Sequence, residues 1–224
     1  MVRDSFNEHD NDLKRVSRQL ISEKVNKHFR DFDKKNIFRV IELLGSGVGY
    51  NYYRSRKTGF SFSNKKLFYL IEKDNEKIQD FLKNKNLPGY GLSDFVICND
   101  DLYKFLETKP EEFFDLINLD FCSYYTEKLK YGYSCVDVIK KMFETNVLKK
   151  NGMFFTTFLH QGYLIELNKR WHDIITDENE IISNIKKIAK QYNRKIKLIS
   201  QFSYKSSSNS HGNSVMLNTG FILH

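Results

Sequence analysis

The chain has 224 residues, of which 40% are hydrophobic, with 11 glycines and only two prolines. This length and composition suit one α/β domain with a full core, and they exclude the fibrous and disordered classes. The net charge of +8 favours contact with phosphate backbones, although an ordinary lysine-rich surface would carry the same excess.

Cysteine usage and apolar runs indicate the compartment. Cys98, Cys122 and Cys135 form no C-x-x-C pair and predict no disulfide framework. The segment 1–12 is polar, without the apolar region of a signal peptide, and no apolar run is long enough to span a membrane. We therefore expect a reduced, cytoplasmic protein without membrane contact. The histidines show no ligand spacing, so no metal is expected.

Residues 11–32 have a helical period. The residues expected to face inward are Leu13, Val16, Leu20, Val25, Phe29 and Phe32. The cations expected on the opposite side are Lys14, Arg15, Arg18, Lys24 and Lys27. Such a helix either covers a ligand or simply packs with a solvated face. We assign 1–36 to an N-terminal helical extension and 37–224 to the main domain.

The most informative stretch is 37–49. An apolar run over 37–41 predicts a buried parallel strand, which leads into Glu42 and then Gly45, Gly47 and Gly49, with Ser46 between the first two glycines. Glycine is needed where the backbone turns sharply and a ligand comes close, because a Cβ would clash. A strand that runs into a glycine turn and a helix is how doubly wound sheets hold nucleotide-like ligands.

This G-x-G-x-G pattern with an acid upstream resembles the first motif of the class I S-adenosylmethionine (SAM)-dependent methyltransferases. The resemblance implies a three-layer α/β sandwich, with a seven-stranded, mostly parallel sheet and an antiparallel C-terminal strand. It also implies SAM as the cofactor, bound by Glu42 and by the loop of Gly45, Ser46, Gly47 and Gly49. Two leucines separate Glu42 from Gly45 here, where the family has one residue.

Tyrosines, phenylalanines and cations alternate through residues 50–62. The segment is poor in helix formers, so we expect a short helix followed by a loop. Its rings either stack on bases beside phosphate-binding cations or form an aromatic plug that closes the cofactor pocket.

Acids follow the next two expected strands. The strand 66–71 ends at Glu72, whose carboxylate can accept both ribose hydroxyls, and Asp74 can cap a helix over 75–86. The apolar run 94–98 precedes Asp100, Asp101 and Leu102. The resemblance implies that Asp101, or else Asp100, bonds the adenine amino group while a backbone N–H beside Leu102 serves a ring nitrogen. The other interpretation of Asp101 is a helix cap.

A fourth strand over 113–120 begins near Asp115 and ends at Asp120. This segment resembles the family's fourth motif, which implies that Asp120 orients or deprotonates the acceptor and that Tyr124 positions it. The prolines of the D-P-P-Y motif found in amino-methylating nucleic-acid enzymes are absent, and so is the Pro-Cys pair of the cytosine-C5 enzymes. Cys122 is more simply a small packing residue.

The remaining pattern predicts a helix over 133–148 that is terminated by 149–152, a fifth strand over 153–158 and a helix over 178–192. The segment 160–175, with the single tryptophan Trp171, is expected at the carboxyl edge of the sheet. Strands over 195–204 and 214–223 must pair as an antiparallel hairpin or bracket each other. Methyltransferases end in this way, whereas plain dinucleotide-binding folds end in a parallel strand.

We therefore expect a SAM-dependent methyltransferase that acts on RNA or DNA. One alternative is a non-catalytic methyltransferase-fold protein that binds nucleic acid or a partner chain. Another is a methyltransferase for a small molecule or a protein. The glycine spacing and the antiparallel ending disfavour a nicotinamide-dependent oxidoreductase.

Overall fold

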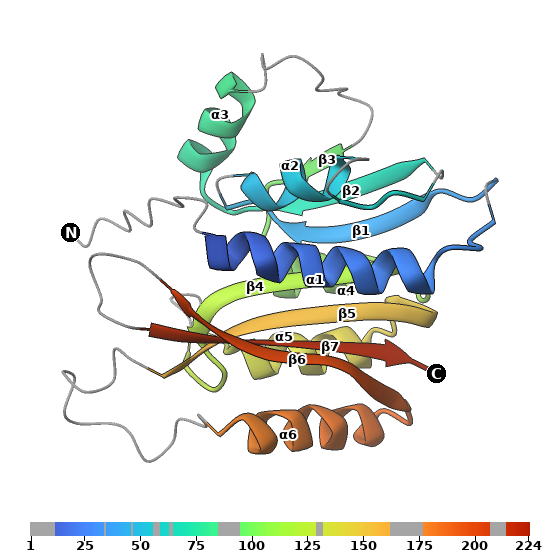
Figure 1. Cartoon of the computed structure of the whole chain (residues 1–224), viewed down its shortest axis with the longest axis vertical. Helices are drawn as coiled ribbons and strands as arrows, with labels where there is room; N and C mark the ends of the chain where they lie inside the picture. Colours follow the sequence, from blue (N-terminus) through green and yellow to red (C-terminus); the bar gives the residue numbers. More distant parts are fainter. Residues whose placement is uncertain are drawn as a thin grey trace.

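The computed structural model describes residues 12–33, 35–45, 47–55, 59–62, 65–84, 95–128, 132–161, 177–206 and 214–224. These residues form one seven-stranded sheet with helices on both faces, the three-layer α/β architecture that the sequence predicts (Figure 1). None of the described helices is long and apolar enough to cross a membrane.

The strand order is β3-β2-β1-β4-β5-β7-β6. The strands are β1 (Phe38–Leu43), β2 (Lys66–Ile71), β3 (Phe95–Cys98), β4 (Phe114–Tyr124), β5 (Leu148–Gln161), β6 (Ile196–Ser206) and β7 (Ser214–Leu223). The first five run parallel, and β7 lies antiparallel between β5 and β6. The antiparallel ending is therefore confirmed, and the carboxyl ends of five parallel strands meet at one edge.

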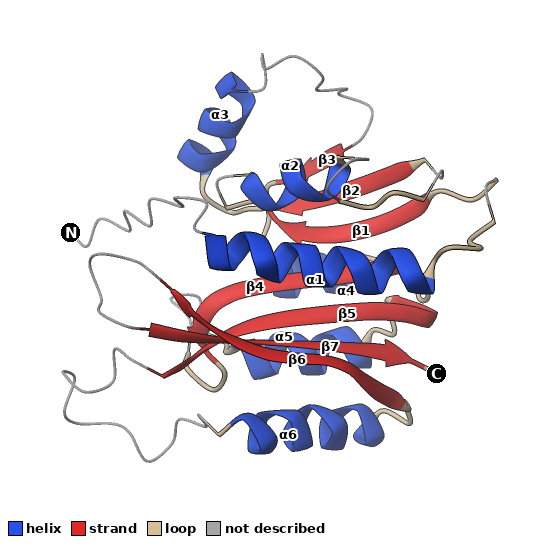
Figure 2. Cartoon of the chain, in the orientation of Figure 1, coloured by secondary structure: helices blue, strands red, loops and turns tan. Residues whose placement is uncertain are grey.

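Helices cover both faces of the sheet, with α1 and α2 on one face and α4 and α5 on the other (Figure 2). The helices are α1 (Asp12–His28), α2 (Val48–Arg54), α3 (Asn75–Asn84), α4 (Leu102–Glu107), α5 (Cys135–Glu144) and α6 (Glu178–Gln191). Apolar faces of α5 and α6 pack with α4 in one core, where Ile139, Ile181 and Ile185 are fully buried. Side chains of α1, α2 and α3 form the second core.

The second core is dominated by aromatic rings. Tyr50, Tyr53, Phe60 and Phe68 are buried there, and the rings of Tyr53 and Phe60 stack with centroids 5.0 Å apart. The short helix expected after the glycine loop is present as α2. Because its rings Tyr50 and Tyr53 are inside the protein, they act as a packed plug and cannot stack on bases. Residues 56–58, which carry two of this segment's cations, lie outside the described residues.

The face that α1 buries differs from the prediction. Val16 is 49% exposed, whereas Arg18 is only 8% exposed and Ser17 and Ser22 are buried with it. The C-terminal half of the helix sets this rotation, because Val25 and Phe29 enter the aromatic core. The apolar spacing predicted the helix correctly but assigned Val16 and Arg18 to the wrong sides, since part of the covered surface is polar.

The start of β5 also differs from the prediction. Lys149 and its neighbours do not end a helix; they form the irregular first residues of a strand that begins at Leu148. The ladder to β4 shifts register here, between the pairs Phe114–Leu148 and Leu116–Met153. Lys149 Nζ lies 2.7 Å from Asp115 Oδ1, whose other oxygen accepts from the Arg39 N–H. Asp115 therefore ties three strands together.

Candidate functional site

Two hollows lie at the carboxyl edge of the sheet, and Leu43 lines both. The first hollow, about 70 Å³, is lined by Lys14, Ser17, Arg18, Ile21, Glu42, Leu43, Leu44, Gly45, Gly49, Tyr53, Asn118, Asp120, Thr157 and Tyr204. The second hollow, about 170 Å³, is lined by Leu43, Ile71, Glu72, Lys73, Asp100, Asp101, Leu102, Phe121, Tyr133 and Val138. Carboxyl-edge crevices are where open α/β sheets bind ligands.

The floor of the first hollow comes from β1 and β4. Glu42 and Asn118 are register partners, so both side chains leave the same face of the sheet. Asn118 Nδ2 donates to Glu42 Oε2 at 2.7 Å, and both residues are only 4% exposed. A Cβ on Gly49 would approach Glu42 Oε1 within 2.5 Å, so a larger residue there would force the Glu42 side chain to shift. This glycine makes room for the buried carboxylate.

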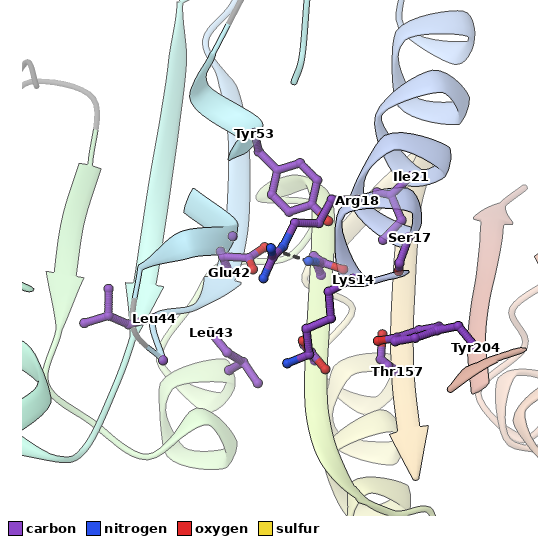
Figure 3. A pocket seen from close by; sticks show the side chains of 14 residues that line it. Lys14, Ser17, Arg18, Ile21, Glu42, Leu43, Leu44, Tyr53, Thr157 and Tyr204 are labelled. Carbon is purple, nitrogen blue, oxygen red and sulfur yellow. Dashed lines mark hydrogen bonds between the residues drawn. The ribbon is translucent and has the colours of Figure 1, made fainter. Parts of the chain in front are cut away.

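Asp120 lies two residues beyond Asn118 and therefore faces the same hollow. Its register partner on β5 is Thr157, whose hydroxyl oxygen accepts from Asn218 Nδ2 at 2.9 Å. The ring of Tyr204, from β6, lies beside Thr157 (Figure 3). A row of polar side chains thus crosses the sheet from β4 to β6.

Helix α1 forms the opposite wall, with Lys14, Ser17, Arg18 and Ile21. Figure 3 shows Arg18 reaching from α1 toward Glu42, with Lys14 entering the same hollow. Burial raises the pKa of the Tyr53 hydroxyl well above its ordinary value, and the negative charge of Glu42 adds to this effect while Arg18 opposes it. Tyr53 therefore stays a neutral hydroxyl among the charged groups.

The second hollow is built from strand-end carboxylates. Glu72 Oε1 accepts from the backbone N–H groups of Lys73 and Asp74, both at 2.9 Å. Asp101 caps α4 by accepting from the Tyr103 N–H at 2.9 Å, and Asp100 Oδ1 accepts from the Asp101 N–H at 2.7 Å. These bonds hold the carboxylates at the rim of the hollow.

The other walls of the second hollow are largely apolar, formed by Leu43, Phe121, Tyr133 and Val138. Apolar walls with a few placed polar groups are typical of small-molecule sites. A nucleoside matches this combination, because its base has apolar faces while its hydroxyl and amino groups donate hydrogen bonds. The carboxylate acceptors and apolar walls of this hollow thus fit an adenosyl group.

The sequence-predicted residues divide between the two hollows. Glu72, Asp100, Asp101 and Leu102 line the second, whereas Glu42, Gly45, Gly49 and Asp120 line the first.

Three predicted residues are not placed in either hollow. Gly47, at φ 80°, lines neither, and a Cβ there would lie 2.5 Å from the Phe81 ring, so this glycine serves packing against α3. Tyr124 is 4% exposed and lines neither hollow. Ser46 lies outside the described residues, as does most of the segment around Trp171.

Sequence reasoning missed Asn118, Thr157 and Tyr204 as lining residues, and it left open whether the side of α1 that carries Lys14 and Arg18 covers a ligand or faces solvent. Asn118 had a detectable signal, since side chains two residues apart on a strand share a face and Asp120 was already a candidate. Thr157 and Tyr204 had no such signal in the sequence, because only the pairing of strands brings them to the first hollow. Within the described ranges, no group of three or more His, Cys, Asp or Glu side chains is arranged to hold a metal.

Solved structures show the same architecture. A SAM-dependent methyltransferase from Methanosarcina mazei matches with a TM-score of 0.57 and 11% identity, covering 89% of this chain and 96% of that one. TYW2 from P. horikoshii, in complex with MeSAdo, matches with a TM-score of 0.53 and 14% identity. The match covers 89% of this chain and 62% of that one. A conserved hypothetical protein from Streptococcus pyogenes matches with a TM-score of 0.53 and 16% identity. The match covers 92% of this chain and 94% of that one.

No protein-family model and no curated protein matches the sequence. The likeness is therefore one of structure, at identities between 11% and 16% in these three comparisons. The strand order and the antiparallel β7 agree with it. This chain has the class I methyltransferase fold, and its structural neighbours include SAM-dependent methyltransferases.

Proposed function

We propose that the protein is a SAM-dependent methyltransferase whose acceptor is a nucleic acid. The observation that carries the proposal is the pair of hollows that share Leu43 as a lining residue, one lined by Glu72, Asp100 and Asp101 and the other by Asp120. A bound ligand that spans Leu43 would present its reactive end to Asp120 while its nucleoside end rests among the carboxylates.

The residues take distinct roles in this proposal. Glu72 holds the ribose hydroxyls, and Asp101 or Asp100 accepts from the adenine amino group beside Leu102. Glu42 and the glycine loop shape the first hollow. Bound SAM supplies an electrophilic methyl group on a sulfonium. Asp120 orients the acceptor and takes the proton that it releases, so the protein contributes mainly alignment of two reactants.

The net charge of +8 supports an anionic acceptor. Lys14 and Arg18, on the wall of the first hollow, bring two of these positive charges to the place where an acceptor would enter. The phosphates of a polynucleotide would be attracted by this positive charge, and its binding would weaken as salt rises.

Calorimetric titration with SAM, S-adenosylhomocysteine and NAD tests the cofactor. We expect both adenosyl-sulfur ligands to bind and NAD not to bind, and the reverse result would reject the proposal. Binding to single-stranded RNA and DNA at several salt concentrations then tests the acceptor, and affinity that is independent of salt would favour a small-molecule or protein acceptor instead.

A non-catalytic binding protein of the same fold is the second candidate. The observation in its favour is that the first hollow measures only about 70 Å³ beneath α1. Transfer of labelled methyl from SAM to any RNA, DNA or protein fraction would exclude this candidate. Tight binding of SAM with no transfer to any fraction would favour it.

A further inference from the structure

The amide of Asn118 has one bonded end and one unbonded end. Its Nδ2 donates to Glu42 Oε2 at 2.7 Å. An ionised carboxylate only accepts, so the amide must present its NH₂ group to Glu42, and the assignment of Nδ2 and Oδ1 cannot be reversed without losing this bond. Asn118 Oδ1 is buried and has no hydrogen-bond partner in the described structure.

A buried acceptor without a donor is unusual, because burial removes it from water without compensation. Asn118 lines the first hollow and is 4% exposed. The hollow, about 70 Å³, is several times larger than the space that one water-sized group needs. A ligand group that enters this hollow therefore comes beside the Asn118 amide.

The neighbours of Asn118 indicate which donor fits. Glu42 and Asp120 place carboxylates on the same face of β1 and β4 as Asn118, so three residues with oxygen acceptors line one small space, which Lys14 and Arg18 also line. A hydroxyl has a single hydrogen to offer, whereas an amino group has two and an ammonium has three. Negative neighbours also strengthen hydrogen bonds from donors that carry positive charge.

We propose that Asn118 Oδ1 accepts an N–H from an amino group of a bound ligand, and that Asn118 thereby positions that ligand. This inference rests on the proposed function, which offers two sources of such a group. One is the α-amino group of the methyl donor, and the other is an amino nitrogen of the acceptor. In either case Glu42 acts by holding the amide in the orientation that leaves Oδ1 toward the ligand.

The test uses two variants of the full chain. Asn118→Leu removes the acceptor at similar volume. The exchange pair, Asn118→Asp with Glu42→Gln, keeps an amide–carboxylate hydrogen bond between the strands and retains an oxygen acceptor at position 118. Melting temperatures of both report any loss of folding, and the exchange pair keeps the test usable if Asn118→Leu fails to fold.

The probes are SAM, decarboxylated SAM and 5′-methylthioadenosine, titrated by calorimetry. The first two carry the amino group and the third does not. If the amino group belongs to the methyl donor, Asn118→Leu weakens the binding of SAM and decarboxylated SAM about tenfold. The affinity for 5′-methylthioadenosine stays unchanged. The exchange pair is expected to recover most of that loss.

If the source is the acceptor, all three ligands bind both variants as they bind the wild type. Methyl transfer to poly(A), poly(C) or poly(G) by Asn118→Leu then falls about tenfold in kcat/KM, and the exchange pair recovers it. Equal weakening of all three ligands, or no change in either binding or transfer, overturns the proposal. Failure of the wild type to bind any of the three would instead reject the proposed function.

Discussion

The two hollows are assembled in different ways. The second hollow takes its carboxylates from turns that directly follow β2 and β3, and their oxygens are held by backbone N–H groups within two residues along the chain. The first hollow joins side chains of α1, β1, β4, β5 and β6. Local chain geometry thus determines one half of the candidate site, whereas long-range packing determines the other. If the proposed function is right, substitutions in the second hollow should affect cofactor binding, whereas substitutions in the first should affect methyl transfer.

The largest effect is expected at Asp120. Asn at this position keeps the shape but cannot take a proton, so turnover should fall about 10²- to 10⁴-fold while SAM affinity stays within about twofold. Transfer of tritiated methyl to RNA or DNA measures the first quantity and calorimetry the second. Asp80→Asn, on the exposed surface of α3, is the matched control. Undiminished turnover in Asp120→Asn would remove Asp120 from the reaction.

Helix α1 supplies the next prediction, because the first hollow depends on its rotation. Ile21 is 3% exposed and Val16 is 49% exposed. Ile21→Ala should lower the free energy of unfolding by about 3 kcal/mol, whereas Val16→Ala should change it by less than about 0.5 kcal/mol. Urea denaturation measures both. Similar losses in the two variants would mean that α1 packs as its apolar spacing first indicated.

Glu72 tests binding in the second hollow. Glu72→Gln retains one oxygen for the N–H groups of Lys73 and Asp74 but replaces the other with a donor, which cannot accept from a ribose hydroxyl. SAM and 5′-methylthioadenosine should both bind about tenfold more weakly by calorimetry. Because Asp100 is exposed, Asp100→Asn serves as the comparison, and a larger loss in that variant would reassign the ribose contact.

Asp101 has two roles that can be separated. Asp101→Ala removes the cap of α4 and should cost about 1 kcal/mol of unfolding free energy. Asp101→Ser can still accept from the Tyr103 N–H, so its stability should stay within about 0.5 kcal/mol of the wild type. Reduced SAM affinity in Asp101→Ser at unchanged stability would identify a ligand contact. Unchanged affinity would leave Asp101 as a cap alone.

Sequence patterns predicted most of the fold because periodicity and glycine chemistry act locally. The strand 66–71 is predicted with the bounds observed for β2, and the terminal strands form the expected antiparallel pair. The isoleucines of 178–192 are buried as expected in α6. The start of β5 was predicted wrongly because Asn151 and Gly152 are typical of the end of a helix. In the structure both residues belong to the irregular first part of β5.

The candidate site was predictable where an acid follows a strand. Glu72, Asp100 and Asp101 stand at strand ends in the sequence, and parallel strands bring such ends to one edge. Gly47 was misleading, because a glycine needed for the close approach of Phe81 has the same sequence signature as one needed for a ligand. Spacing alone cannot distinguish the two causes.

By itself, the sequence indicated the class of fold through its resemblance to a known family, and its local patterns indicated the two terminal strands and the acids at the strand ends. Only the tertiary structure decided that α1 buries Arg18 and exposes Val16, that Asn118 holds Glu42, and that Thr157 and Tyr204 join them. Those outcomes depend on which surfaces meet across the sheet. When a helix packs over a polar hollow, its polar side can be the side that is buried. The spacing of apolar residues within the helix does not indicate which surface it will pack against.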